Sequence, residues 1–295
     1  MSDLKYAEAH WERVVPAPVI DDAFVREQLA AWPELLDRPW TVLADGLRCV
    51  KLRIGEVVVR ISTGNTPTQA KERALHDLFA SDLHTPRVID GDQRRLIMEY
   101  VPHTDLPDTR EAGDCAGRAA ARIHRHTREA AGFLDAQLNV VEPFVSAWDG
   151  LRDFAEQRLP SQYADALRAL WDKHDARIRA ACAQPVLVHA DFKPANIKWL
   201  PEQRDVVVFD WEFAWAGPAL FDVGQLMRWG VPPQFEEGFA EGYRAQGGVL
   251  PDDWQRIGEL LDLVNMVAFL DHASQQPRRD ADVIKRIERT LQLSK

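Results

Sequence analysis

The residues best suited to chemistry lie in one stretch, between Val186 and Asp222. Three short apolar segments, 186–188, 197–200 and 206–209, each deliver polar side chains at one end. These side chains are His189, Asp191, Lys193, Asn196, Asp210 and, further on, Asp222. Carboxylate and amide oxygens held at strand ends form a rigid set of ligands, which Mg²⁺ and a phosphate chain require. The stretch therefore predicts metal-assisted chemistry on a phosphate group.

Strand and turn patterns account for the placement of these side chains. The three apolar segments are rich in β-branched residues and predict strands, with a charged turn between the second and the third. Pro185 ends a helix predicted over 161–183 and delivers the chain to the first strand. Gly217-Pro218 starts the helix that carries Asp222. Each polar group is thus tied to the end of a regular element.

An earlier region predicts a small antiparallel sheet. Segments 40–44, 48–54 and 57–62 are strand-like and are separated by turns, which indicates a three-stranded meander. Gly46 lies in the first turn, so backbone N–H groups of that loop could lie over phosphates, although a lone glycine taken by itself favours an ordinary hairpin turn. A second hairpin is predicted over 87–101.

One main helix is predicted between the meander and the second hairpin. Thr66 is expected as its N-cap, Pro67 as its first helical residue, and Gln69 as the partner that closes a capping box. Apolar residues then follow at three- and four-residue spacing as far as Phe79. Glu72 stands at the border of that apolar face.

The strand pattern stops at Pro102, where we place a boundary between two lobes. Glu99, Tyr100 and Val101 form the connector, where backbone N–H and C=O groups can meet a purine edge; a strand end with no ligand fits the pattern equally well. We expect an N-terminal extension over 1–38 with no visible chemistry, a nucleotide-binding lobe over 39–102, and a mainly helical lobe over 103–295.

Composition excludes several classes of protein. The chain has 295 residues, of which 46% are hydrophobic and 28% charged, as in an ordinary globular protein. No apolar run approaches the roughly 20 residues that span a bilayer, so no membrane partner is expected. Three distant cysteines predict neither a disulfide framework nor a zinc site. Together with an N-terminus unlike a signal peptide, this predicts a cytoplasmic protein.

Charge is concentrated in one part of the chain. The net charge of −10 argues against a nucleic-acid partner. Residues 202–271 contain 13 Asp and Glu against 4 Arg and no Lys, an excess of nine negative charges. This excess is either a solubilising surface or a field that attracts a cationic substrate.

The motifs between 189 and 222 resemble those of the aminoglycoside phosphotransferase family, whose relatives include choline kinases and homoserine kinases. The resemblance is carried by His189-Ala190-Asp191-Phe192-Lys193-Pro194-Ala195-Asn196, Val208-Phe209-Asp210-Trp211-Glu212, Gly217-Pro218 and Asp222. It implies an α+β, protein-kinase-like bilobal fold: a small antiparallel sheet with one main helix, then a larger, mainly α-helical lobe. It also implies ATP and Mg²⁺ as cofactors.

The resemblance assigns roles to residues 186–222, named here the catalytic stretch, and to residues 189–196 within it, the catalytic loop. Asp191 would be the catalytic base for a substrate hydroxyl, and Lys193 would neutralise charge near the γ-phosphate. Asn196 and Asp210 would hold Mg²⁺. His189 would hold the backbone of the catalytic loop, and Asp222 would brace that loop from the following helix. Ala190 stands where the family commonly has glycine.

The resemblance also assigns a nucleotide site in the first lobe. Arg60 would bind the α- and β-phosphates, although a cation in a strand otherwise indicates an edge position facing water. Glu72 would pair with Arg60 and aim its guanidinium, and the loop at Gly46 would cover the phosphates. Glu99, Tyr100 and Val101 would contact the base.

The predicted reaction is transfer of the γ-phosphate of ATP to a hydroxyl group of a small molecule. Only 11 residues separate Asp210 from Asp222, which leaves little room for the regulated loop of a protein kinase. An amine-bearing acceptor is suggested by the acidic region and its tryptophans, while choline, homoserine and sugar alcohols stay open. The alternative is a pseudokinase that binds nucleotide without catalysis. Candidate amine-binding residues are Glu212, Glu236, Glu237, Glu259, Asp262 and Asp271, with Trp211, Trp215 and Trp229.

Overall fold

The described chain divides into two compact units. The computed structural model describes residues 7–12, 18–43, 49–62, 68–228, 230–270 and 276–292. The sheet unit comprises Arg13–Pro102 with Ala136–Leu138. The helical unit comprises Met1–Glu12, His103–Asp135 and Asn139–Lys295. The division falls between Pro102 and His103, where the sequence places the lobe boundary.

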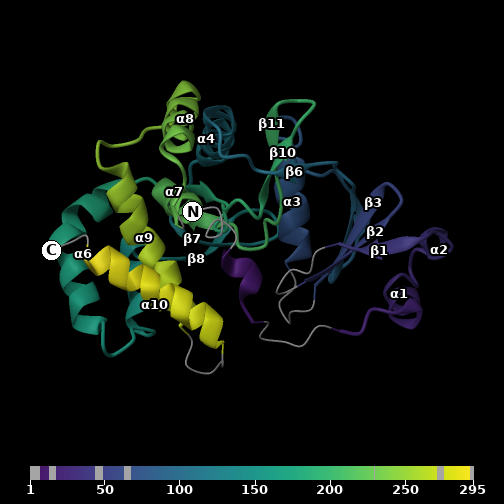
Figure 1. Ribbon diagram of the computed structural model, residues 1–295, viewed down its shortest axis with the longest axis horizontal. Helices are drawn as coiled ribbons and strands as arrows, with labels where there is room; N and C mark the ends of the chain where they lie inside the picture. Colours follow the sequence, from purple (N-terminus) through teal and green to yellow (C-terminus); the bar gives the residue numbers. More distant parts are fainter. Residues whose placement is uncertain are drawn as a thin grey trace. The chain divides into compact units, whose positions relative to one another are not determined.

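The sheet unit is built on five antiparallel strands (Figure 1). They are β1 (Trp40–Val42), β2 (Cys49–Ile54), β3 (Val57–Ser62), β4 (Val88–Gly91) and β5 (Arg95–Glu99). Their order in the sheet is β1-β2-β3-β5-β4. The predicted meander and second hairpin are therefore confirmed by the pairing of β1 with β2, β2 with β3, and β4 with β5.

The core of this unit includes part of the predicted N-terminal extension. In β2 the alternate residues Val50, Leu52 and Ile54 are fully buried, as expected for a strand with one face in the core. They pack in one cluster with residues of α1 (Asp22–Gln28) and α2 (Pro33–Leu36). Residues 7–12 belong instead to the helical unit. The first 38 residues are thus divided between the two units.

Helix α3 (Gln69–Phe79) begins later than its sequence pattern suggests. Its N-cap is Thr68, which has αR dihedral angles and whose side chain makes no capping hydrogen bond. The predicted N-cap Thr66 and first-turn Pro67 lie outside the described residues. The Thr68 hydroxyl instead donates to Glu72 Oε1 at 2.7 Å, so it supports an acidic side chain one turn into the helix.

The helical unit contains the helix predicted over 161–183 and the helix predicted to start at Gly217-Pro218. Its helices within the described residues are α4 (Arg110–His124), α5 (Ala147–Glu156), α6 (Ala164–Ala181), α7 (Ala219–Met227), α8 (Pro233–Ala245), α9 (Trp254–Phe269) and α10 (Pro277–Gln292). A short 3₁₀ helix, η2 (Ala7–His10), precedes the sheet unit in the sequence.

Two small sheets carry the predicted catalytic stretch. One has the order β11-β10-β6 and the other β8-β7-β12-β9. The predicted strands are β9 (Val186–Val188), β10 (Ile197–Leu200) and β11 (Asp205–Val208). The sequence patterns did not indicate β6 (Thr104–Asp105), β7 (Gly132–Leu134), β8 (Val140–Pro143) or β12 (Trp215–Gly217). These strands are two to four residues long, too short for an alternation to stand out.

Close helix packing fixes the helix that follows the catalytic stretch. A Cβ placed on Gly224 of α7 would lie 2.1 Å from the carbonyl oxygen of Gly258 in α9. Helices α4 and α8, which lie side by side in Figure 1, use the same device: a Cβ on Gly117 would lie 2.1 Å from the carbonyl oxygen of Phe239. Glycine at these positions lets the backbones approach, which locks α7 against α9.

Two further sequence expectations can be compared with the described chain. Within it, no helix is both long and apolar enough to cross a membrane. Cys49, Cys115 and Cys182 are buried free thiols. Burial raises the pKa of Cys182 to about 12, so this thiol is protonated and unreactive at neutral pH.

Candidate active site

Strand pairing brings the two predicted metal ligands together. In the β10–β11 ladder Ile197 pairs with Val208, and the Phe209 N–H donates to the Asn196 carbonyl at 2.9 Å. Asn196, one residue before the ladder, and Asp210, two residues after it, therefore occupy the same end of this hairpin. Asp210 has a φ of +68°, a left-handed conformation that Asp adopts more readily than most residues and that is common at functional sites.

The carboxylate of Asp191 is held from two sides. Its Oδ2 accepts a hydrogen bond from Asn196 Nδ2 at 2.7 Å, and its Oδ1 lies 2.9 Å from Lys193 Nζ. The same Asn196 amide nitrogen also donates to the Asp191 carbonyl at 3.0 Å. Because the side chain of Asp191 is 18% exposed, the carboxylate is fixed in direction yet still reachable from solvent.

His189 is a structural residue of the catalytic loop, as the resemblance implies. Its Nδ1 accepts a hydrogen bond from the Asp191 N–H at 3.2 Å, so its Nε2 carries the proton and donates to the Phe209 carbonyl at 2.8 Å. The ring thereby ties the loop that carries Asp191 to the residue before Asp210. The imidazole is fully buried and lies against Trp211 with ring centroids 4.7 Å apart and the ring planes tilted by 45°.

Asp222 braces the catalytic loop from α7, as predicted. Its two carboxylate oxygens accept hydrogen bonds from the backbone N–H groups of His189 and Ala190, each at 2.7 Å. Ala190 has a φ of +63°, a conformation that glycine adopts at lower cost. The brace therefore holds a strained residue directly before Asp191.

The buried side chains of His124, Tyr243 and Gln225 support this brace, and no sequence pattern predicts this role for them. His124 Nε2 donates to Asp222 at 3.0 Å, and its Nδ1 lies 2.9 Å from the Tyr243 hydroxyl. Burial and the charge of Asp222 raise the pKa of Tyr243 well above its usual value, so the hydroxyl stays protonated and donates. Gln225 accepts from the Phe192 N–H at 3.0 Å and donates to the Ala190 carbonyl at 2.8 Å.

Lys193 has two acidic partners, Asp191 and Glu8, and no sequence pattern predicts the second. Besides Asp191, its ammonium lies 2.5 Å from Glu8 Oε2. Burial by itself would lower the pKa of Lys193, but the carboxylates of Asp191 and Glu8 raise it above the usual value. The side chain is therefore charged at neutral pH. Glu8 also accepts from Arg228 at 2.6 Å, and Arg228 is paired with Asp262 at 2.8 Å.

Glu8 and Arg228 are thus site residues that sequence reasoning missed. Arg228 offered a weak signal, because it is a lone cation at the end of an apolar helical segment. Glu8 offered none, because it lies 185 residues from Lys193 in the sequence and in a weakly patterned segment.

In the sheet unit, Arg60 and Glu72 form a buried ion pair. Arg60 NH1 donates to both carboxylate oxygens of Glu72, at 2.7 and 2.6 Å, and the side chains are 3% and 1% exposed. The predicted pairing is confirmed. The alternative edge position is wrong, because β3 lies between β2 and β5 in the middle of the sheet.

The connector places its residues at the end of β5. The Glu99 N–H donates to the Arg87 carbonyl at 3.0 Å and the Tyr100 N–H to the Glu56 carbonyl at 2.8 Å. The guanidinium of Arg53 lies over the Tyr100 ring, 3.6 Å from its centroid. The N–H groups of Glu99 and Tyr100 are therefore engaged within the sheet unit. Gly46 lies outside the described residues.

Most of the acidic candidates for amine binding already have partners. Glu236 accepts from Gln255, Glu237 from Arg110, Glu259 from Arg256, and Asp262 from Arg228. Glu212 lies beside the buried Trp211 in the turn after Asp210. Asp271 and Trp229 lie outside the described residues.

The expected cation–π role of two tryptophans is wrong. Trp211 is fully buried and Trp215 is 6% exposed. Trp215 packs on Phe144 and Phe221, with centroids 5.7 Å apart in each pair. Both rings belong to the core, where an incoming ammonium group cannot reach their faces.

The donor set at Asn196 and Asp210 suits magnesium chemically. Within the described residues no group of three or more His, Cys, Asp and Glu side chains could hold a metal ion. Asn196 uses its amide nitrogen on Asp191, which directs that nitrogen inward and leaves an amide oxygen as the ligand atom. An amide oxygen and a carboxylate are the hard donors that Mg²⁺ takes, in the small number it needs when phosphates and water complete its shell.

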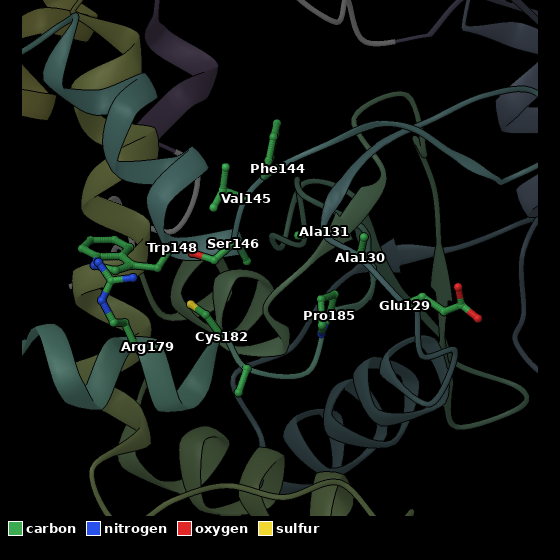
Figure 2. Close-up of a pocket in the computed structure, with 12 residues that line it drawn as sticks. Glu129, Ala130, Ala131, Phe144, Val145, Ser146, Trp148, Arg179, Cys182 and Pro185 are labelled. Atoms are coloured by element: carbon green, nitrogen blue, oxygen red, sulfur yellow. The ribbon is translucent and has the colours of Figure 1, made fainter.

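A separate cavity of about 270 Å³ contains none of the predicted site residues (Figure 2). It is lined by residues 129–131, by 144–148 around the start of α5, and by 179–185 around the end of α6. In Figure 2 Glu129 lies at one end of it and Trp148 at the other. The cavity therefore has no part in the chemistry argued from the catalytic stretch.

The fold is shared with several solved phosphotransferase structures. A choline/ethanolamine kinase family protein from Mesorhizobium loti matches with a TM-score of 0.65 and 19% identity over 91% of this chain and 92% of that one. Macrolide 2′-phosphotransferase MphH from Brachybacterium faecium matches with a TM-score of 0.66 and 18% identity, over 89% of this chain and 97% of that one.

A third structure is a thermostable mutant of aminoglycoside phosphotransferase APH(4)-Ia in ternary complex with ADP and hygromycin B. It matches with a TM-score of 0.65 and 16% identity over 92% of this chain and 97% of that one. At these identities the likeness concerns the fold, and it confirms the predicted α+β, protein-kinase-like class. A search of curated proteins gives no match.

The sequence itself matches a family model. The model described as the phosphotransferase enzyme family, APH, covers residues 20–260. That range includes both the Arg60–Glu72 pair and the whole catalytic stretch, and it confirms the resemblance drawn from the motifs. The chain belongs to the phosphotransferase enzyme family.

Proposed function

We propose that this protein transfers the γ-phosphate of ATP to a hydroxyl group of a small molecule. The observation that carries the proposal is the state of Asp191, whose two oxygens are held by Asn196 and Lys193 while the side chain stays partly exposed. A carboxylate fixed in this way can accept the hydrogen bond of an incoming hydroxyl and orient it for attack. Positioning and charge neutralisation, rather than a covalent intermediate, supply the catalysis.

The other residues have roles that follow from their surroundings. Lys193 is charged and would neutralise a transferring phosphate. Asn196 and Asp210 would hold Mg²⁺, which, when bound, offsets the negative charge of the nucleotide phosphates. In the sheet unit Arg60, aimed by Glu72, would bind the α- and β-phosphates, because its planar guanidinium suits phosphate oxygens.

The purine would meet the connector formed by Glu99, Tyr100 and Val101. The N–H groups of Glu99 and Tyr100 donate within the sheet unit, which fixes the course of the connector at the end of β5. Gly46 remains a proposed phosphate contact.

An amine-bearing acceptor stays the first class to test. Its support is the excess of acidic residues between 202 and 271, rather than the individual side chains named for it, since four of the six have partners within the described chain. Choline-like compounds, amino alcohols such as homoserine, and sugars belong in the same panel.

The test is ADP release with Mg-ATP across aminoglycosides, amino alcohols and sugars, with Asp191→Ala as the control variant. We expect turnover with at least one acceptor, and its loss in the variant while nucleotide binding persists. Mg-ATP binding without turnover on any acceptor would favour the pseudokinase alternative. Full turnover by Asp191→Ala would remove Asp191 from its proposed role.

A further inference from the structure

The N-terminal segment Glu8–Glu12 reaches the catalytic loop of the helical unit. Glu8 lies in η2 and its side chain is 13% exposed. Its Oε2 contacts Lys193 Nζ at 2.5 Å, and its Oε1 accepts from Arg228 NH1 at 2.6 Å. Each oxygen of this carboxylate therefore holds a cation, and one of these cations lies two residues after Asp191.

The same segment is anchored at a second place. Trp11 is buried, donates through its indole N–H to Asp282 at 3.0 Å, and packs edge-on against Phe269 with centroids 5.1 Å apart. Glu12 accepts from the backbone N–H of Arg278 at 3.1 Å, in the first turn of α10, where such groups lack a partner within the helix. Glu8 is thus delivered by a segment that is docked independently of the catalytic loop.

Arg228 gives Glu8 a rigid base. Its side chain is 1% exposed, and it donates to both oxygens of Asp262 at 2.8 and 3.0 Å. These residues belong to the end of α7 and to α9, whose backbones are locked by Gly224 and Gly258. A guanidinium paired in this planar manner has little freedom, so its second partner is also fixed.

Lys193 is the most flexible of the side chains that Glu8 links. A lysine carries three N–H donors on a four-carbon stem that has several rotamers. Its contacts with Asp191 Oδ1 and Glu8 Oε2 take two of these donors, which leaves one for a phosphate oxygen. If Asp191 were the only acidic partner, the ammonium could swing around it, and its charge would not be aimed before the nucleotide arrives.

We propose that Glu8 is a positioning residue for phosphoryl transfer: it fixes Lys193 Nζ beside Asp191 by bridging it to Arg228. The inference rests on the proposed function, because it assumes that Lys193 neutralises the transferring phosphate. Residues 7–12, which show no chemistry in the sequence, then complete the catalytic loop. Groups that are aimed in advance stabilise a transition state without reorganising during the reaction.

The contrary role for the same contacts is an inhibitory one, in which the Glu8 carboxylate blocks the ammonium from phosphate. The buried Trp11 and the α10 contact of Glu12 favour positioning, because they dock the segment permanently. The two roles predict opposite changes in rate.

The test compares Glu8→Gln with Glu111→Gln in the full chain. The first change removes the bridging charge with almost no change in shape. Glu111 is the matched control: it is a glutamate of the same unit that pairs with Arg204 at 2.7 Å, away from the catalytic loop. We expect Glu8→Gln to lower kcat about tenfold with the KM for ATP within a factor of about two, and Glu111→Gln to change neither.

A double variant separates positioning from general damage. In a Lys193→Met background, Glu8→Gln should lower kcat no further, because its effect passes through Lys193. A rise in kcat on Glu8→Gln, an unchanged kcat, or an equal loss in both backgrounds would each overturn the proposal. Trp11→Ala, which loosens the anchor without touching the bridge, should lower kcat in the same direction by a smaller factor.

A chemical readout keeps the proposal distinct from the proposed function. Acetylation of lysines by an amine-reactive reagent, followed by mass spectrometry, reports how strongly Lys193 is held. Lys193 should react several-fold faster in Glu8→Gln than in the unchanged chain, while other lysines react equally. If no acceptor is phosphorylated, the proposed function fails, yet an unchanged Lys193 reactivity would still refute the bridge on its own.

Discussion

The two units contain ion pairs of different design. In the sheet unit Arg60 and Glu72 are almost completely buried, and Arg60 gives NH1 to both carboxylate oxygens. In the helical unit the charges form a chain that runs from Asp262 through Arg228 and Glu8 to Lys193 and Asp191. We call Arg60–Glu72 the closed pair, and the five linked side chains from Asp262 to Asp191 the extended group.

Exposure along the extended group shows what the difference means. Arg228 and Asp262 are each 1% exposed, Glu8 is 13%, and Lys193 and Asp191 are 20% and 18%. Buried charges at one end supply rigidity, and partly exposed charges at the other end can meet a substrate. A closed pair fixes one guanidinium, whereas the extended group carries the rigidity of its buried end to Asp191, the residue that we propose orients the hydroxyl.

The largest effect should follow from removing Asp191, at the partly exposed end of the extended group. Asp191→Ala is expected to reduce turnover at least about a thousandfold, because the group that orients the hydroxyl is lost, while Mg-ATP binding measured by calorimetry stays within a few-fold. The protein should unfold at nearly the same denaturant concentration, because Asp191 is partly exposed. A large loss of stability would mean that Asp191, like Arg228 and Asp262, serves mainly to hold the fold.

Breaking the closed pair should act on stability. Glu72→Gln leaves the Arg60 charge buried without its partner, which costs about 3–5 kcal/mol of unfolding free energy. Urea unfolding followed by circular dichroism measures it. Replacing both Arg60 and Glu72 by apolar residues should cost less than Glu72→Gln alone, and a larger cost would contradict the view that the uncompensated charge is what destabilises.

Asp222→Asn tests the hydrogen bonds with which Asp222 braces the catalytic loop. The change leaves one oxygen to serve the backbone N–H groups of His189 and Ala190, so it should cost about 2 kcal/mol of unfolding free energy and lower kcat more than KM. Gln225, which holds the same loop through Phe192, limits the damage. Unchanged kinetics would show that the brace serves folding alone.

The Lys193 contacts predict a pH dependence with a definite sign. Asp191 and Glu8 raise the pKa of Lys193 in the folded state despite burial. Its contribution to stability is then fully present below the unfolded pKa of about 10.4 and is lost as the pH rises through the folded value. The stability difference between the unchanged chain and Lys193→Met should be constant from pH 6 to about pH 9 and shrink only above that. A difference that shrinks below pH 9 would contradict this pairing.

The smallest effect is expected at Ala190. Its φ of +63° costs an alanine about 1 kcal/mol relative to glycine, but glycine loses more chain entropy on folding. Ala190→Gly should therefore change stability by less than about 1 kcal/mol and leave kcat within about twofold. A tenfold loss of kcat would show that the rigidity of Ala190 itself matters to Asp191.

Much of the fold was open to prediction because its signals are local. Alternation identified β2 and β3, and apolar spacing identified α3, whereas β6 and β12 are too short to alternate. Helix α3 begins at Gln69, later than the capping pattern at Thr66 suggests, and Thr66 itself lies outside the described residues. Four of the six acidic candidates for amine binding have partners in the described chain, which composition does not reveal, because it identifies an acidic region but not the partner of each carboxylate.

The sequence by itself determined the catalytic loop, since Asp191, Asn196 and Asp210 are set by two strands and one turn whose pattern is local. Only the tertiary structure decided what holds that loop. Asp222 reaches His189 across 33 residues, and Glu8 reaches Lys193 across 185. No periodicity links such positions, because their meeting depends on how α7, α9 and α10 pack, and that packing is settled by close backbone contacts such as Gly224 on Gly258.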